Sequence, residues 1–294
     1  MILGLVALFA GCPGPEPSSE EDVPRFGTSG TFEVVTWNIE NFGQDALTPF
    51  ERVAAIIRRL DVDMVAVQEI VSQEAFDSLL ASLPGWGGYR ASPSSSWQEL
   101  AYLYRTSTIA PYRVPFEIYL DEDQALPREP FVFPVAFGSV ELFLINNHFK
   151  CCGNGIIEAD PSDEEARRQA ASQLLEDYIR SELPGRNVIL LGDLNDEVNE
   201  PRESNVFQNF IDDDSLFNFV TTTIAADTSQ ATYPHPPWFS FIDHIMITAS
   251  LFDEWQSSGH VETLRLDDVL DDYFDEISDH RPVAMKLELA PSLP

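Results

Sequence analysis

Basic side chains are scarce in this chain. Its 294 residues include 17 Lys and Arg against 49 Asp and Glu, a net charge of -32, and the only lysines are Lys150 and Lys286. Such a surface should repel nucleic acid and anionic membranes at low salt. Three explanations fit: solubility in a salty medium, a surface that binds divalent cations, or a substrate that is not a long polyanion. We favour the first, because the acidic residues are spread along the whole chain.

Cysteine is also scarce, and the three present are Cys12, Cys151 and Cys152. A thiolate metal site is disfavoured, because no other cysteines are there to complete it. The Cα atoms of the adjacent pair Cys151 and Cys152 lie about 3.8 Å apart across a trans peptide, which is below the usual range for a disulfide. A bond between them would be strained, yet an oxidising compartment could form it.

The chain has no long apolar run. Its N-terminal apolar run, Met1 to Ala10, is too short to span a bilayer. The run ends in Phe9-Ala10-Gly11-Cys12, which resembles the end of a bacterial lipoprotein signal peptide with lipidation at Cys12. A plain secretory signal or a frayed apolar end is the alternative. We expect residues 1–12 to be the signal, residues 13–30 a flexible linker, and the protein to be exported. It would be membrane-anchored through Cys12, otherwise periplasmic or secreted.

One stretch, Asn187 to Glu197, joins an apolar strand to a cluster of polar side chains. Val188 to Leu191 are apolar on both faces, which is typical of a strand buried between two layers. Gly192 allows a sharp bend, and Asp193 and Asn195, two residues apart, then point the same way. Taken alone, the pattern fits a functional site and an ordinary polar turn equally well.

The rest of the chain repeats this arrangement within one expected domain, residues 31–290. We predict strands at 31–37, 63–68, 100–104, 112–119, 131–135, 140–148, 188–191, 241–248 and 283–289, and helices at 50–60, 74–83 and from Ser162 to Gly185. The close spacing of the four middle strands favours antiparallel meanders.

The last of these helices carries a capping-box pattern, Ser162 with Glu165 three residues on. Its apolar face is expected to be Ala166, Ala170, Leu174 and Tyr178. Arg167 and Arg168 are then placed on a solvated face.

Polar side chains gather at the ends of the predicted strands. They are Asn38, Glu40, Glu69, His148, Asp193, Asn195, Asp243, Asp279 and His280. Carboxylate and amide oxygens suit hard cations such as Mg²⁺, Mn²⁺ or Ca²⁺. Two histidines can supply an acid and a base near neutral pH, and an Asp beside a His fixes its tautomer. Together these groups suit metal-assisted hydrolysis of a phosphate ester.

Six motifs in sequence order carry a family resemblance. They are Trp37-Asn38-Ile39-Glu40, Val67-Gln68-Glu69, Asn146-Asn147-His148, Gly192-Asp193-Leu194-Asn195, Ile242-Asp243-His244-Ile245 and Ser278-Asp279-His280-Arg281-Pro282. From about Thr31 to Leu289 the chain resembles the endonuclease/exonuclease/phosphatase superfamily with the DNase I-like fold. The resemblance implies a four-layer α/β/β/α sandwich, in which two mixed β-sheets pack face to face with helices outside and the site lies at one edge.

The resemblance also implies a metal site. Glu69 would be the principal ligand of Mg²⁺ (or Mn²⁺ or Ca²⁺), with Asn38 and Asp279 close to the metal or holding its water shell. Glu40 stands where many relatives have Asp or another small polar residue, so its role stays open.

Catalytic roles follow from the same motifs. Asp193 and Asn195 would position the attacking water and a phosphate oxygen. His280, oriented by Asp243, would contact the phosphate or take the proton of the water. His148 would protonate or stabilise the leaving oxygen, and it places the chain nearer the DNase I and sphingomyelinase branches.

Other histidines have simpler explanations. His244 follows Asp243 on a strand and should face the opposite side, so we expect a core residue rather than a ligand. His235 and His260 lie in loop-like stretches and are expected at the surface.

The resemblance therefore implies an enzyme whose partner is a phosphodiester substrate cleaved by in-line attack of water, and the N-terminal segment adds the expectation that this enzyme is exported and tethered to a membrane. We expect a monomer and, as the first hypothesis, a nuclease. The alternatives are a sphingomyelinase-type phospholipase C, a small-molecule phosphodiesterase or phosphatase, and a catalytically silent binding module. The acidic surface weighs against a nuclease, because no basic stripe is present to hold a long nucleic acid.

Overall fold

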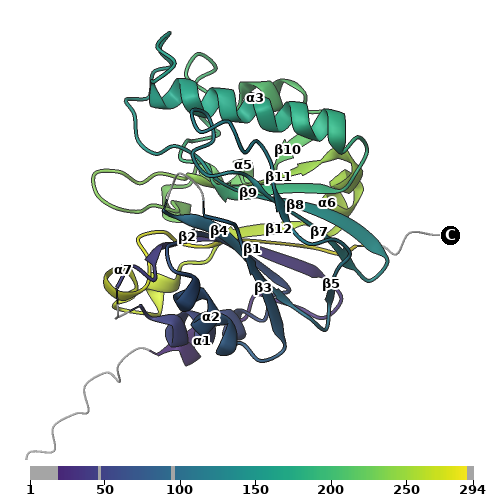
Figure 1. Cartoon of the computed structure of the whole chain (residues 1–294), viewed down its shortest axis with the longest axis vertical. Coiled ribbons are helices and arrows are strands. Elements are labelled where there is room, and N and C mark those ends of the chain that lie inside the picture. The colour runs from purple at the N-terminus through teal and green to yellow at the C-terminus, as the bar shows by residue number, and fades with distance from the viewer. Residues whose placement is uncertain (1–18, 46–47, 94–96, 290–294) are drawn as a thin grey trace, which may run out of the picture.

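Alternation along β1 (Phe32–Phe42) sends its side chains into two different cores. Val35 and Trp37 belong to one hydrophobic cluster, while Phe32 and Val34 belong to another. A strand that is buried on both faces needs a covering layer on each side. The computed structural model describes residues 19–45, 48–93 and 97–289, and in it two sheets lie between helices (Figure 1).

Two mixed sheets pack face to face. The first has the order β12-β13-β1-β2-β4-β3, and the second has the order β10-β11-β9-β8-β7-β5, with β6 paired to β7. Each contains one parallel pair, β1 with β2 and β8 with β9, among antiparallel neighbours. The remaining strands are β2 (Met64–Ile70), β3 (Trp86–Arg90), β4 (Glu99–Arg105), β5 (Ile109–Pro111), β6 (Phe116–Glu117), β7 (Phe131–Phe137), β8 (Val140–His148), β9 (Val188–Asp193), β10 (Phe217–Phe219), β11 (Asp243–Thr248), β12 (His260–Thr263) and β13 (Val283–Leu287).

Helices cover the two outer faces, which confirms the expected four-layer sandwich. α1 (Phe50–Leu60), α2 (Gln73–Ala81) and α7 (Tyr273–Glu276) pack on the first sheet, and α3 (Glu164–Glu182) and α4 (Gln208–Asp212) pack on the second. α5 (Thr222–Ala225) and α6 (Phe252–Ser258) contribute side chains to the core between the sheets. Short 3₁₀ turns lie at Glu20–Asp22, Thr228–Gln230, Ala249–Leu251 and Leu266–Asp268.

The described part of the predicted linker belongs to this fold. Val23 and Phe26 are buried in the core beside α1, and Lys286 donates a hydrogen bond to the Phe26 carbonyl oxygen at 3.1 Å. The prediction of a flexible linker is therefore wrong for residues 19–30, because two apolar side chains among the prolines and serines dock this segment. Cys12 and the predicted signal, residues 1–12, lie outside the described residues. Among the residues described, no helix has the length and apolar character needed to cross a membrane.

Two predicted strand regions differ in the structure. β3 lies in a stretch where no strand was predicted, since its two glycines hide the strand pattern. They are there for packing: a Cβ on Gly87 would lie 2.4 Å from the Tyr104 ring. Of the strand predicted at 112–119, only the two residues of β6 form a strand, and β5 ends just before that range. Prolines, which lack an N–H donor, stand at 111 and 115.

α3 buries a different face from the one predicted. Its N-cap is Asp163, whose side chain accepts a hydrogen bond from the Ala166 N–H, and Ala170 is exposed. The buried residues are Glu165, Arg168, Ala171, Ser172, Leu175, Glu176 and Ile179. The buried face of α3 contains several polar residues, so a search for apolar residues at helical spacing did not identify it.

A buried polar bridge joins the two sheets beneath the site. The Gln68 side-chain nitrogen on β2 donates to Asn146 Oδ1 on β8 at 2.7 Å. Asn146 in turn donates to the carbonyl oxygens of Val67 at 3.0 Å and Ala101 at 3.1 Å, and its side chain is fully buried. Because buried donors and acceptors are costly to leave unpaired, this bridge fixes how the sheets face one another.

We predict that Asn146→Ala lowers the free energy of unfolding by about 2–4 kcal/mol, because it removes three buried hydrogen bonds and leaves their partners unpaired. Urea denaturation followed by circular dichroism measures the change. The control is Asn187→Ala, which removes a single hydrogen bond, to the Glu141 carbonyl oxygen, at an exposed position. Equal losses in the two variants would contradict the role given to the bridge.

Candidate active site

Polar strand ends from both sheets meet at one edge of the sandwich. β1 and β2 run parallel, as do β8 and β9, so Asn38, Glu69, His148 and Asp193 come at corresponding ends. β11 is antiparallel to β9 and places Asp243 opposite Asp193. β13 is antiparallel to β1, so the segment before it, with Asp279 and His280, returns to the same edge. The structure thus brings the predicted site residues together.

The bend at Gly192 allows this close approach. Gly192 has φ +142°, and a Cβ there would lie 2.0 Å from the Asn147 carbonyl oxygen on the paired strand. Only glycine fits that position without moving β8. Asp193 follows directly and is 1% exposed.

His280 and Asp243 form a buried pair. His280 Nδ1 lies 2.8 Å from Asp243 Oδ2, and His280 Nε2 faces the pocket, 3.8 Å from Asp193 Oδ2 and 4.0 Å from Asp279 Oδ1. Burial disfavours the charged ring, but the Asp243 and Asp193 carboxylates outweigh it and raise the pKa of His280 to about 10. At neutral pH the ring therefore presents a positive N–H donor to the pocket.

Asp193 lies at the centre of a hydrogen-bond network. Asn38 Nδ2 donates to Asp193 Oδ2 at 3.0 Å and to Glu69 Oε1 at 3.1 Å. The Asn195 N–H donates to Asp193 Oδ1 at 3.0 Å. Burial, and then the negative charge of Asp243, raise the pKa of Asp193 to about 7. A carboxyl group with such a pKa can accept a proton near neutral pH.

Glu69 is held in an unusual backbone conformation. Its φ is 65°, and the Asn41 N–H donates to Glu69 Oε2 at 2.9 Å. The left-handed conformation costs energy for a residue with a side chain. It turns the carboxylate of Glu69 toward the pocket, where 14% of the side chain is exposed.

His148 lines the same pocket, next to Asp193 and Glu69. Its Nε2 is 3.5 Å from Asp193 Oδ2 and 3.9 Å from Glu69 Oε1. Burial, with the positive charges of Arg128 and His280, lowers the pKa of His148 well below its usual range. His148 is therefore a neutral ring beside a charged one, so the two histidines differ in protonation state.

Asn195 and Asp279 complete the predicted set. Asn195 has φ 53°, and its side chain donates to the Phe149 carbonyl oxygen at 3.2 Å. The Asp279 side chain is 32% exposed and lines the same pocket.

The donor set of this pocket fits a hard divalent cation. Glu69, Asp193 and Asp279 supply carboxylate oxygens from three elements, and their crowding would be relieved by bound positive charge. Asp193, Asp243 and His280 also form a tight group, with ligand atoms within 4.8 Å of one another. Because Asp243 is fully buried and its Oδ2 already bonds His280, the more open Glu69 and Asp279 are better placed to bind a metal.

The pocket measures about 580 Å³ and has walls that the motifs did not indicate. The additional lining residues are Cys151, Cys152, Gly153, Tyr233, Trp238 and Ser240. Trp238 is 66% exposed, on a loop whose ends, Tyr233 and Ser240, pair with each other. Sequence patterns could not find these residues, since they come from loops without periodicity.

Arg168 is not on a solvated helix face as predicted. It is buried, donates to Asp196 Oδ2 at 2.8 Å, and donates to the carbonyl oxygens of Lys150 and Cys152. It therefore supports the loop after His148 from behind. Arg167, by contrast, is only half-buried.

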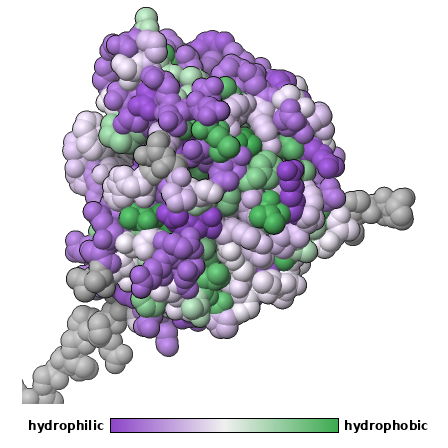
Figure 2. All heavy atoms as spheres, viewed as in Figure 1, coloured by the Kyte–Doolittle hydropathy of each residue, from purple (hydrophilic) through white to green (hydrophobic). Residues whose placement is uncertain are grey.

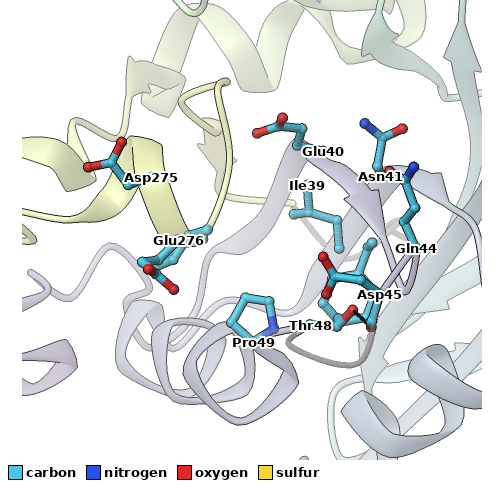
Figure 3. Close-up of a pocket in the computed structure, with 11 residues that line it drawn as sticks. Ile39, Glu40, Asn41, Gln44, Asp45, Thr48, Pro49, Asp275 and Glu276 are labelled. Atoms are coloured by element: carbon cyan, nitrogen blue, oxygen red, sulfur yellow. Dashed lines mark hydrogen bonds between the residues drawn. The ribbon is translucent and has the colours of Figure 1, made fainter.

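Glu40 faces a second hollow beside the first. That hollow measures about 310 Å³, and Glu40 shares it with Asp45, Asp275 and Glu276 (Figure 3). Burial, and then the charge of Asp279, raise the pKa of Glu40. Its side chain adds negative charge near the site, while its N–H donates to Asn38 Oδ1 at 3.0 Å.

His244 lies in the core, as predicted. Its Nδ1 is 3.0 Å from Thr221 Oγ1, its Nε2 is 2.9 Å from the Asp196 carbonyl oxygen, and Phe207, Phe219 and Phe241 surround the ring. Burial lowers the pKa of His244 to about 4. His260 is exposed, as expected, whereas His235 is half-buried and approaches the Asp279 carbonyl oxygen at 2.9 Å.

Comparison with known proteins matches most of this chain to a family model. The model of a family described as the Endonuclease/Exonuclease/phosphatase family matches residues 35–280. Among curated proteins, none matches the sequence of this chain.

Solved structures share the fold. D. rerio TDP2 complexed with a single-strand DNA product has a TM-score of 0.63 at 15% identity, over 88% of this chain and 99% of that one. The endonuclease/exonuclease/phosphatase from Bacteroides vulgatus has a TM-score of 0.62 at 16% identity, over 88% and 99%. The catalytic domain of human Nocturnin with a bound sulfate anion has a TM-score of 0.60 at 18% identity, over 89% and 95%. At these identities the likeness concerns the fold.

We predict that His244 makes the protein less stable as the pH falls from about 6.5 toward 4. The unfolded chain binds a proton on this residue in that window and the folded chain does not, so stability drops by about 3 kcal/mol. Chemical denaturation at several pH values, compared between the wild type and His244→Gln, isolates this contribution. The prediction is wrong if the two proteins show the same pH dependence.

Proposed function

This chain belongs to the Endonuclease/Exonuclease/phosphatase family, whose enzymes are metal-dependent phosphoric ester hydrolases, and from that premise we propose that it hydrolyses phosphodiester bonds by in-line attack of water. The observation that carries the proposal is the position of Asp193 between two buried histidines, with its Oδ2 3.5 Å from His148 Nε2 and 3.8 Å from His280 Nε2. A base, a cationic donor and a neutral donor at one pocket are the groups that this reaction needs.

Asp193 would orient the attacking water and take its proton. Its carboxylate is fixed by Asn38 and by the Asn195 N–H, and its raised pKa suits a base near neutral pH. Fixing the base in advance avoids reorganisation during the reaction. The Asn195 side chain lies at the same wall and would contact a phosphate oxygen.

His280 would donate a hydrogen bond to the phosphate as a cation. Asp243 holds the proton of Nδ1 and directs Nε2 into the pocket. Of the two roles expected for His280, phosphate contact is favoured over proton abstraction, because a ring with a pKa of about 10 already carries its proton. His148, a neutral ring, would stabilise the leaving oxygen through Nε2.

A divalent cation held by Glu69 and Asp279, with Asn38 orienting Glu69, would supply positive charge to the phosphate oxygens. Mg²⁺ is the cation we propose first, and Mn²⁺ and Ca²⁺ suit the same oxygen donors.

A nuclease-like substrate is our first candidate. Trp238 lines the pocket with most of its ring exposed, and such a ring can stack a nucleobase beside the scissile phosphate. The net charge of -32 favours short or single-stranded substrates over long duplexes. Figure 2 shows strongly hydrophilic side chains interspersed with pale and hydrophobic ones over the face drawn.

A phospholipid is the second candidate. Trp238 and Phe239 are adjacent, 66% and 51% exposed, and could contact a lipid surface. The candidate also draws on the proposal that the protein is exported and anchored through a lipid on Cys12. Mass spectrometry of the N-terminal peptide from membranes of the native host would test that anchor.

We predict that Asp193→Asn and His280→Asn each lower kcat/KM by about 10²–10⁴-fold. Asp243→Asn should lower it less, because His280 keeps a hydrogen-bond partner but loses its counter-charge. The full chain is assayed with Mg²⁺, Mn²⁺ or Ca²⁺ against bis(4-nitrophenyl) phosphate, single-stranded DNA, RNA and sphingomyelin.

The matched control is His260→Asn, an exposed histidine outside the pocket, which should keep full activity. If no substrate is turned over with any metal, the chain is a binding module on this fold. If the Asp193 and His280 variants retain full activity, the residue assignment is wrong.

We predict that Glu69→Gln weakens Mn²⁺ binding by about tenfold or more, because the carboxylate loses its charge. Electron paramagnetic resonance titration of free Mn²⁺ measures this without substrate. Glu74→Gln on the exposed side of α2 is the control for weak binding to the acidic surface. Equal affinities in the two variants would place the ion elsewhere.

A further inference from the structure

Two thiols lie on the wall of the candidate active site. Cys151 and Cys152 follow His148 closely, both line the 580 Å³ pocket, and their Sγ atoms are 2.7 Å apart. Cys151 is half-buried and Cys152 is exposed, and both are free thiols. Small molecules that enter the pocket can therefore reach this pair, and no step proposed for hydrolysis uses it.

The backbone holds the thiols together. Cys152 has φ 76°, a left-handed conformation that is costly for a residue with a side chain. Buried Arg168 stabilises it by donating to the carbonyl oxygens of Lys150 at 2.9 Å and Cys152 at 2.7 Å. Because Arg168 is itself fixed by Asp196, the loop is clamped to the end of β9.

The two thiols differ in environment. Lys150 Nζ lies 3.9 Å from Cys151 Sγ, so a positive charge stands beside that sulfur and favours Cys151 as the attacking group. Burial and the neighbouring Cys151 thiol raise the pKa of Cys152 to about 11.

A short chain of contacts joins the thiols to the catalytic carboxylate. The Phe149 N–H donates to the Asp193 carbonyl oxygen at 2.9 Å, and Asn195 and Arg128 both donate to the Phe149 carbonyl oxygen. A change at residues 151 and 152 would therefore shift the main chain that positions Asp193 and Asn195.

We propose that Cys151 and Cys152 are a reversible modification site, at which a small disulfide such as oxidised glutathione converts the two thiols to a disulfide and lowers activity. The Cys151 thiolate attacks the glutathione disulfide, forming a mixed disulfide and releasing one glutathione thiolate. Cys152 then loses its proton and attacks the Cys151 sulfur, which releases the second glutathione. The protein is oxidised by two electrons and the reagent is reduced by two.

Reversibility follows from covalent geometry. Cα atoms of neighbouring residues are about 3.8 Å apart, closer than in ordinary disulfides. A strained bond of this kind is reduced more readily than a structural disulfide. The same strain would be transmitted through the clamped loop to Phe149.

The experiment uses the full chain with Cys12→Ala, so that only the pair reacts. After treatment with oxidised glutathione, we expect two fewer titratable thiols, a mass lower by two hydrogen atoms, and no dimer. Hydrolysis should fall by about tenfold, as expected for a misplaced catalytic group. Dithiothreitol should restore both thiols and activity.

Cys152→Ser is the matched variant, and each protein is compared with its own reduced form. After oxidation, the Cys152→Ser variant should gain the mass of one glutathione and form no disulfide within the chain. The proposal is overturned if the parent keeps both thiols after oxidation, or if the disulfide forms without a change in activity. The thiol count and mass need no substrate, so failure of the proposed hydrolysis would be recognised separately.

Discussion

The packing of two parallel strand pairs, one from each sheet, is the constraint on which the site depends. β1 and β2 lie in one sheet and β8 and β9 in the other, and the bridge between Gln68 and Asn146 joins them across the core. Because parallel strands end on the same side, two such pairs held face to face bring four strand ends to one edge. Asn38, Glu69, His148 and Asp193 are neighbours for this reason.

Negative charge concentrated in a buried place gives the site its chemistry. Asp193 and Asp243 lie within the low-dielectric interior, where their repulsion is strong and each depends on a donor from another element. Burial, and then the charge of Asp243, raise the pKa of Asp193. The carboxylates of Asp243 and Asp193 outweigh the effect of burial on His280 and raise its pKa. Glu69 and Asn195 also have left-handed backbone conformations, which lower the stability of the folded chain at this edge of the sandwich.

Loops form the outer walls of the pocket. The sheets fix the reacting groups, whereas the segment after β8 adds two thiols and the segment before β11 adds Trp238. Buried Arg168 connects the first of these loops to the segment after β9, so this pocket wall and the Asp193 end of β9 share a support. The proposed substrate contacts and the proposed modification site would therefore lie on elements that can vary while the sandwich stays constant.

Local patterns in the sequence were enough to predict the strands with strong alternation, the helix α1, the family, and the set of polar residues at strand ends. His244 was also placed in the core from its position next to Asp243, since alternation is a local property of a strand. Other features depend on tertiary contacts and could not be predicted from local patterns. Tertiary structure docked Val23 and Phe26, buried Arg168 on a polar helix face, formed β3 around two glycines, and placed Cys151, Cys152 and Trp238 at the pocket. These outcomes depend on partners far away in the chain, whose contacts and charges exist only once the two sheets have packed.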